Sequence, residues 1–124
     1  MKVRCIRLLD AMGREISVSP WLQLGHVYHV LSMGIDNYGN RNFGIVSDYR
    51  DDEWPLLASH RADCFEIVSE HVPSNWRSSV NDGYTDISPA SWQEQNFYES
   101  FSEHEPWTFP VFEHEREVIL REDP

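Results

Sequence analysis

The sequence has few cysteines, few basic residues and no long hydrophobic run, and each shortage excludes a class of protein. Only two of the 124 residues are cysteine, and Cys5 and Cys64 lack the paired spacing of a zinc site. No run of about 20 apolar residues is present, so no helix is expected to span a bilayer. Because the charged start of the chain, residues 1–7, is unlike a secretory signal, we expect a cytoplasmic protein whose thiols are reduced and unreactive.

Basic residues are scarce as well. The chain has 10 Lys and Arg against 21 Asp and Glu, which gives a formal net charge of −11. A nucleic-acid-binding domain usually presents a basic surface to the phosphate backbone. Direct binding of DNA or RNA is therefore not expected. An acidic balance of this size favours either a basic protein partner or a solubilising surface.

The acidic excess lies in the second half of the chain. Residues 1–62 hold seven basic and seven acidic side chains, whereas residues 63–124 hold three basic and fourteen acidic ones. Any surface that attracts a basic partner is therefore expected after residue 62.

Short β-type segments separated by turns fill residues 1–70. The apolar and β-branched stretches are residues 3–9, 26–31, 42–47, 54–58 and 64–68, with a shorter one at 15–18. Asn and Gly in the segment 36–40 are typical of a hairpin loop. Several short strands with tight turns predict a small curled sheet or barrel.

The composition changes after residue 70. Residues 71–88 are rich in Ser, Asn, Asp, Gly and Pro, which predicts a loop. Ser88 followed by Pro89 is typical of a helix start. Residues 89–124 are therefore expected to form two short helices, the second with an apolar stripe. The predicted fold is one α+β domain, with a barrel over 1–70, a loop over 71–88 and an acidic helical end.

The search for catalytic motifs finds none. The sequence has no phosphate-binding P-loop, no nucleophile elbow and no paired-cysteine signature. His26 and His29 are spaced for a shared metal only if they lie on a helix; on the expected strand they point to opposite faces. We therefore expect no enzyme activity, no metal and no cofactor.

Acidic side chains dominate the two expected helices. Glu113 and Glu117, one turn apart, repel each other by roughly 0.2–0.5 kcal/mol. Because clustered acid of this kind slightly opposes folding, it suggests a partner outside the chain, although acids near a helix N-terminus are also favoured by the helix dipole. The candidate partner-binding residues are Glu99, Glu103, Glu105, Glu113 and Glu117, with Trp107 as an apolar anchor.

The aromatic residues of the first half suggest an alternative. Trp21, Tyr28, Tyr49 and Trp54 lie near the expected loops, where such residues can form a cage for a cation or a platform for a peptide. The same residues could equally be core and rim, because a short chain needs large side chains to bury enough area. This alternative is a small-molecule or peptide-binding module.

Four segments together resemble a known kind of protein. They are residues 25–30 (GHVYHV), 64–69 (CFEIVS), 73–76 (PSNW) and 112–120 (FEHEREVIL). The pattern resembles small bacterial proteins with an SH3-like barrel and a short helical C-terminus, some of which are similar to immunity proteins of toxin systems. The resemblance implies the fold but assigns no site residue. Together with the charge, it leads us to expect an immunity or antitoxin-like protein that neutralises a basic effector.

Overall fold

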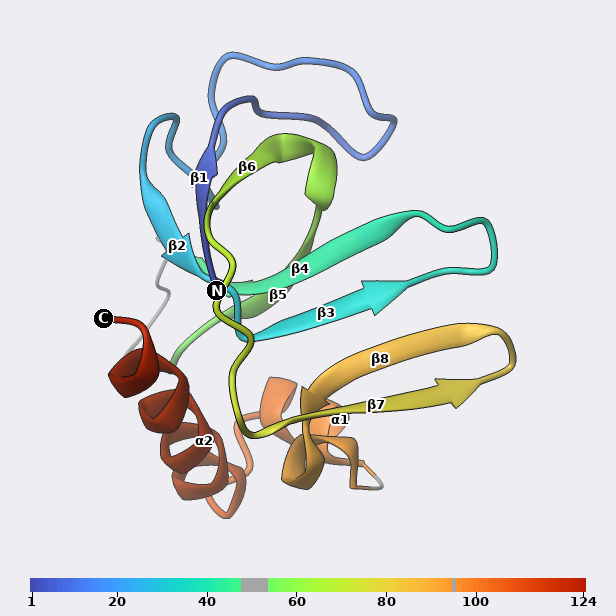
Figure 1. The fold of residues 1–124 in the computed structure, drawn as a ribbon, viewed down its shortest axis with the longest axis vertical. Helices are drawn as coiled ribbons and strands as arrows, with labels where there is room; N and C mark the ends of the chain where they lie inside the picture. The colour runs from blue at the N-terminus through green and yellow to red at the C-terminus, as the bar shows by residue number, and fades with distance from the viewer. Residues whose placement is uncertain (48–53, 95) are drawn as a thin grey trace.

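The computed structural model describes residues 1–47, 54–94 and 96–124. Within these ranges the chain forms two antiparallel sheets followed by two helices, which confirms the predicted α+β class (Figure 1). The strands are β1 (Lys2–Cys5), β2 (Val27–His29), β3 (Ser32–Ile35), β4 (Arg41–Val46), β5 (Leu57–Arg61), β6 (Phe65–Ser69), β7 (Trp76–Asn81) and β8 (Tyr84–Pro89). The helices are α1 (Phe97–Ser102) and α2 (Thr108–Glu122), with single 3-10 turns η1 (Ala62–Cys64) and η2 (Ala90–Gln93).

The strands do not close into a barrel in the described part of the chain. They form a three-stranded sheet, β2-β1-β6, and a five-stranded sheet, β5-β4-β3-β8-β7. The chain changes sheet at Val30 and Leu31, both buried, between β2 and β3. One edge of β3 then pairs with β4 and the other with β8. The second edge of β3 is therefore occupied by β8, a strand that was not predicted from the sequence.

The prediction of a loop over residues 71–88 is wrong. Most of this segment forms the antiparallel hairpin of β7 and β8. Asp82 and Gly83 have φ angles of 52° and 80°, and two consecutive residues with positive φ are typical of the tight turn that joins twisted strands. Ser78 and Ser79 are exposed on β7, and neighbouring strand residues point to opposite faces, so loop-forming residue types here occupy both faces of an edge strand.

Two local predictions also fail. The segment 15–18 is not a strand, since its pairing is limited to one bridge between Leu9 and Glu15. Ser88 and Pro89 end β8 instead of starting a helix. Pro89 lies opposite Trp76, beyond the last residue of β8 that pairs with β3. The missing N–H of proline is tolerated there because the ladder to β3 has already ended.

The hairpin predicted at residues 36–40 is confirmed. The Asp36 carboxylate accepts hydrogen bonds from the backbone N–H groups of Tyr38 and Asn40, both at 2.9 Å. Gly39 supplies a φ of +84°, a conformation that glycine adopts without steric penalty. The Asn40 N–H bond is the main reason that the pKa of Asp36 is lowered.

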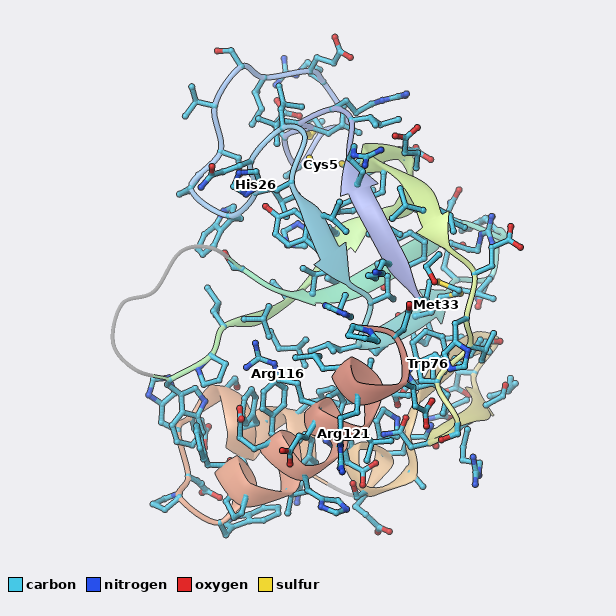
Figure 2. The ribbon with its side chains drawn as sticks, turned by 60° about the vertical axis from the view of Figure 1, so that its left-hand side comes forward. Cys5, His26, Met33, Trp76, Arg116 and Arg121 are labelled. Atoms are coloured by element: carbon cyan, nitrogen blue, oxygen red, sulfur yellow. The ribbon has the colours of Figure 1, made fainter. Side chains whose placement is uncertain are left out.

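The core has a sheet part and an aromatic part at the helical end. Val3, Val30 and Ile45 are at most 1% exposed between the sheets. At the helical end, the Phe112 ring stacks on Phe101 and Trp92, with centroid separations of 4.4 and 5.0 Å. Both cysteines are buried in the sheet part, where Cys5 lies far from the helices (Figure 2).

The end of α2 is attached to the three-stranded sheet. The Asp123 carboxylate lies 3.1 Å from the Met1 amino group and accepts a 2.6 Å hydrogen bond from the Ser69 hydroxyl. The Ser69 bond is the main cause of the lowered pKa of Asp123. His29 Nε2 lies 2.7 Å from the Asp123 carbonyl oxygen. Among the described residues, no helix combines the length and apolar character needed to cross a membrane.

Candidate functional site

The predicted partner-binding residues lie on α1, on α2 and in the connection between these neighbouring helices, at one end of the molecule (Figure 1). Glu99 lies in the first turn of α1, and Glu103 caps its C-terminus one turn later. Glu117 lies on α2. All three are exposed, and none has an ion-pair partner among the residues that the structure describes. These three carboxylates are the part of the predicted surface that is open to a partner.

The other predicted residues of this surface have partners within the chain. The indole N–H of Trp107 donates a 2.8 Å hydrogen bond to the Glu105 carboxylate. The Trp107 side chain is 52% exposed, and one edge of its ring packs against Phe97. Glu113 lies 3.5 Å from Arg116, one turn along α2. Trp107 is therefore placed as an exposed aromatic next to the acids, whereas Glu113 is partly neutralised.

Two further acids of α2 hold the connection between β6 and β7. The Glu122 carboxylate accepts hydrogen bonds from the backbone N–H of Ser74, at 2.8 Å, and from the Ser74 hydroxyl, and it lies 3.2 Å from His71. The Ser74 hydroxyl bond is the largest cause that lowers the pKa of Glu122 to about 2. Glu115 accepts a 2.9 Å hydrogen bond from the Asn75 side chain. Part of the acidic excess is thus structural, which the charge count could not show.

The aromatics of the alternative hypothesis are not brought together. Trp21, 40% exposed, borders a pocket of about 510 Å³, whereas Tyr28 and Trp54 line two other hollows. The Tyr28 hydroxyl accepts a 2.9 Å bond from the Gln23 N–H. Tyr49 lies outside the described residues. The three described members therefore form no common cage.

The Trp54 side chain, which precedes β5 in the sequence, packs against the helical end. Its ring stacks on His104 at a centroid distance of 4.7 Å and packs against Phe101 and Phe109 at 5.3 and 5.4 Å. Its role is therefore to cover the aromatic core, with one side open to a small hollow. This placement follows from tertiary packing and has no signal in the local sequence.

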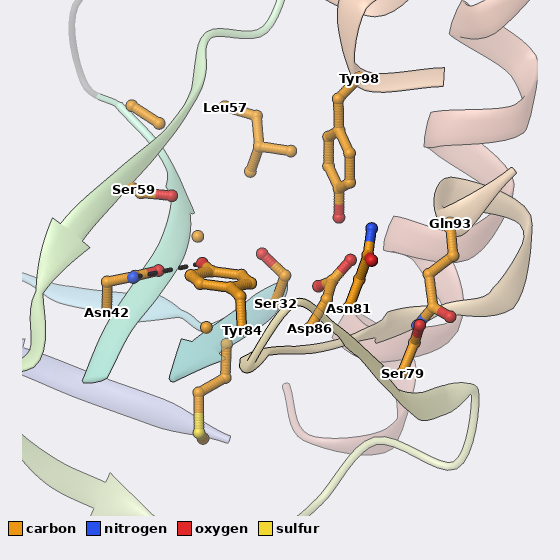
Figure 3. A pocket seen from close by; sticks show the side chains of 14 residues that line it. Ser32, Asn42, Leu57, Ser59, Ser79, Asn81, Tyr84, Asp86, Gln93 and Tyr98 are labelled. Carbon is orange, nitrogen blue, oxygen red and sulfur yellow. Dashed lines mark hydrogen bonds between the residues drawn. The ribbon is translucent and has the colours of Figure 1, made fainter. Parts of the chain in front are cut away.

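A polar pocket that was not predicted from the sequence lies on one face of the five-stranded sheet (Figure 3). Its volume is about 470 Å³, which is within the range of small-molecule sites. Hydroxyl and amide side chains dominate its lining: Ser32, Ser59, Ser79, Asn42, Asn81 and Gln93. Leu57 from β5 and Tyr98 from α1 close the side nearest the helices (Figure 3).

Two glycines on adjacent strands form the floor of this pocket. A Cβ atom on Gly34 would overlap the Tyr84 hydroxyl, and one on Gly44 would overlap the Ser32 hydroxyl. The Asn42 amide donates a 3.4 Å hydrogen bond to the Tyr84 hydroxyl. The absence of side chains at Gly34 and Gly44 therefore lets Tyr84 and Ser32 lie flat over the sheet.

Asp86 and Tyr98 provide the titratable groups of the pocket. Burial raises the pKa of Asp86, with a Ser88 hydrogen bond acting in the opposite direction. Burial also raises the pKa of Tyr98 to about 12, and the nearby Asp86 charge adds to this effect. A pKa of about 12 keeps the Tyr98 phenol protonated at neutral pH, so the pocket holds this hydroxyl group together with the half-buried Asp86 side chain. A signal was present in the sequence, since the turn Asp82–Gly83 predicts a hairpin that carries both Tyr84 and Asp86.

Comparison with known proteins adds no assignment: no family model, no curated protein and no solved structure matches the chain. Metal binding also has no evident site, since no group of three His, Cys, Asp or Glu side chains that could hold an ion is found in the described ranges.

Proposed function

We propose that this protein is a non-enzymatic binding domain whose helical end docks on a basic protein. The observation that supports the proposal is the arrangement of Glu99, Glu103 and Glu117 around α1 and α2, exposed and without ion-pair partners in the described part of the chain. Acidic groups of this kind would accelerate encounter with a basic partner and exclude competing polyanions.

Trp107 would act as the apolar anchor of this surface. Tryptophan is frequent among the residues that dominate binding energy, and near-neutral contacts around such residues exclude water from them. Its 52% exposure leaves enough ring area for a partner to cover. The bond from Trp107 Nε1 to Glu105 fixes the ring orientation before binding, which lowers the entropy lost on association.

The proposal extends to the biological type of the protein. An immunity or antitoxin-like protein of bacterial cytoplasm would use such a surface to cover the substrate cleft of a basic effector, for instance a nuclease. The finer SH3-like description of the sheets belongs to this proposal as well. Its support is the succession of six short strands, β1 to β6, with a single 3-10 turn between β5 and β6.

Affinity capture from the lysate of the native host, treated with nuclease, tests the proposal. The bait proteins are the wild type, a Glu103→Lys/Glu117→Lys variant, a Trp107→Ala variant, and a Glu15→Lys/Glu70→Lys control. Glu15 and Glu70 are exposed acids outside the helical end, and both double variants change the net charge equally. We expect a basic protein that the wild type and the control retain, that elutes at moderate salt, and that the two helical-end variants lose.

Two outcomes contradict the proposal. In the first, the helical-end variants retain the same proteins as the wild type. In the second, the control variant loses these proteins to the same extent as the helical-end variants, which would reveal only a general charge effect. A small-molecule or peptide-binding module remains the second candidate, because half-exposed Trp21 borders a pocket of about 510 Å³. That module predicts loss of binding in Trp21→Ala and no effect of charge reversal.

A further inference from the structure

The polar pocket on the five-stranded sheet is a second site, separate from the acidic helical surface. It lies over β3, β4 and β8 and is closed on one side by Tyr98 of α1 (Figure 3). None of its polar groups is needed for the protein-binding surface proposed above. Its chemistry therefore indicates a ligand of its own.

The charge of the pocket limits the class of ligand. Asp86 is the one charged residue that lines it in the described part of the chain. No described basic side chain lines the pocket to pair with a phosphate or carboxylate ligand, so an anion would meet repulsion from Asp86. A cation would meet a carboxylate that is half-buried and lacks a counter-ion among the described residues.

The remaining groups match a cation that also donates several hydrogen bonds. Tyr84 lies across the pocket, and Tyr98 enters it from the helical side with its hydroxyl group foremost (Figure 3); aromatic rings attract organic cations. The Gln93 amide nitrogen already donates to the carbonyl oxygens of Arg77 and Ser88, at 2.7 and 3.0 Å, so its oxygen is left as an acceptor. A carboxylate with flanking acceptors and aromatic rings is suited to a planar guanidinium.

We propose that this pocket binds a guanidinium or ammonium group, with Asp86 as its counter-ion and Tyr84 and Tyr98 as its aromatic walls. Two sources of that group share this chemistry: a free small cation, or the side chain of an arginine or lysine presented by another protein. The raised pKa of Asp86 supports the proposal, because it results from burial, and a bound cation would relieve that penalty.

NMR titration of the full-length protein labelled with ¹⁵N tests this site. The probes are arginine amide and citrulline amide, which have nearly the same shape but differ in charge. We expect arginine amide to shift the backbone resonances of Ser79, Asp86 and Tyr98 and to bind roughly tenfold or more tightly than citrulline amide. The peptide acetyl-Gly-Arg-Gly-amide identifies the source: tighter binding than arginine amide indicates a protein side chain, and weaker binding indicates a free small cation.

Asp86→Asn is expected to remove the preference for arginine amide, whereas Asp82→Asn is the matched control. Asp82 lies in the turn of the same hairpin, with positive φ, where Asn is well accommodated. Ser79→Lys is a second test variant. The ammonium group of the introduced lysine would itself pair with Asp86, so this variant is expected to bind arginine amide more weakly than the wild type. Equal affinity for the two amides, binding that survives Asp86→Asn, shifts confined to α1 and α2, or no binding up to the solubility limit would each overturn the proposal. The Glu103→Lys/Glu117→Lys variant is expected to bind arginine amide as the wild type does, so the pocket proposal and the docking proposal can be refuted independently.

Discussion

Tyr84 on β8 lies directly over Gly34 on β3, so closely that a Cβ atom on Gly34 would overlap the phenol oxygen. Gly34 pairs with Asn42 on one side and Asp86 on the other. This single contact therefore joins the middle of the five-stranded sheet to the floor of the polar pocket.

Gly34→Ala is expected to destabilise the protein and to disorder the pocket. The added methyl group must displace Tyr84 or move the strand, and overpacking of this kind costs about 1–3 kcal/mol. Urea denaturation followed by tryptophan fluorescence measures the loss. Ser78→Ala, at an exposed position of β7, is the control and should change the free energy of unfolding by less than about 0.5 kcal/mol. A Gly34→Ala protein as stable as the control would show that Tyr84 is not packed as described.

Trp76→Phe is expected to reduce stability by about 1–3 kcal/mol, because a buried acceptor loses its partner. The Trp76 indole N–H donates a 3.0 Å hydrogen bond to the Leu31 carbonyl oxygen, at the point where the chain changes from one sheet to the other. Trp107→Phe removes a bond of similar length, 2.8 Å, at the surface, and should cost clearly less. Equal losses in the two variants, measured by thermal and urea unfolding, would contradict this assignment.

Glu122 is expected to make the protein sensitive to acid. Its pKa falls from the ordinary 4.5 to about 2 in the folded state, chiefly through the Ser74 hydroxyl bond. A depressed folded-state pKa stabilises the fold fully above the unfolded value, and the stabilisation is lost as the pH falls from about 4.5 towards 2. The stability difference between wild type and Glu122→Gln should therefore shrink over this range. Glu117→Gln, at an exposed site, should show no such trend; an equal trend in both variants would refute the role of Glu122.

Asp86 is expected to behave in the opposite way. Its pKa is raised by burial, so the folded state disfavours the carboxylate, and stability is lost as the pH rises from the unfolded value of about 3.9 through the folded one. Asp86→Asn should therefore gain stability relative to wild type as the pH rises from 4 to 7, measured by urea unfolding at each pH. Asp82→Asn should show no such gain. A variant that is less stable than wild type at neutral pH would mean that the Ser88 hydrogen bond to Asp86 outweighs the cost of burying the carboxylate.

The sequence predicted those elements whose signals are local. The Asp36–Asn40 hairpin was recognisable because the Asp36 carboxylate and Gly39 stabilise the turn on their own. The β7–β8 hairpin was missed because its serine-rich edge strand has the composition of a loop, although Asp82–Gly83 was a usable turn signal. Because β8 was not predicted, the strands of residues 1–70 were expected to close into a barrel.

The candidate sites were less accessible to prediction than the fold. The charge count placed the acids in the second half correctly, but it could not separate the exposed Glu103 from Glu122, whose carboxylate holds Ser74. The pocket depends on register: Gly34 faces Asp86 only because β3 and β8 pair as they do. Pairing between distant segments of the chain carries no local signal.

Site-specific photo-crosslinking in the native host tests directly whether the helical end is the docking surface. p-Benzoylphenylalanine is placed in turn at Glu103 and Glu117, and at Glu15 and Glu70 as controls. We expect a crosslink to one basic protein from the first two positions and none to that protein from the controls. A crosslink to the same protein from all four positions, or from the controls alone, would contradict the claim that the helical end is the docking surface.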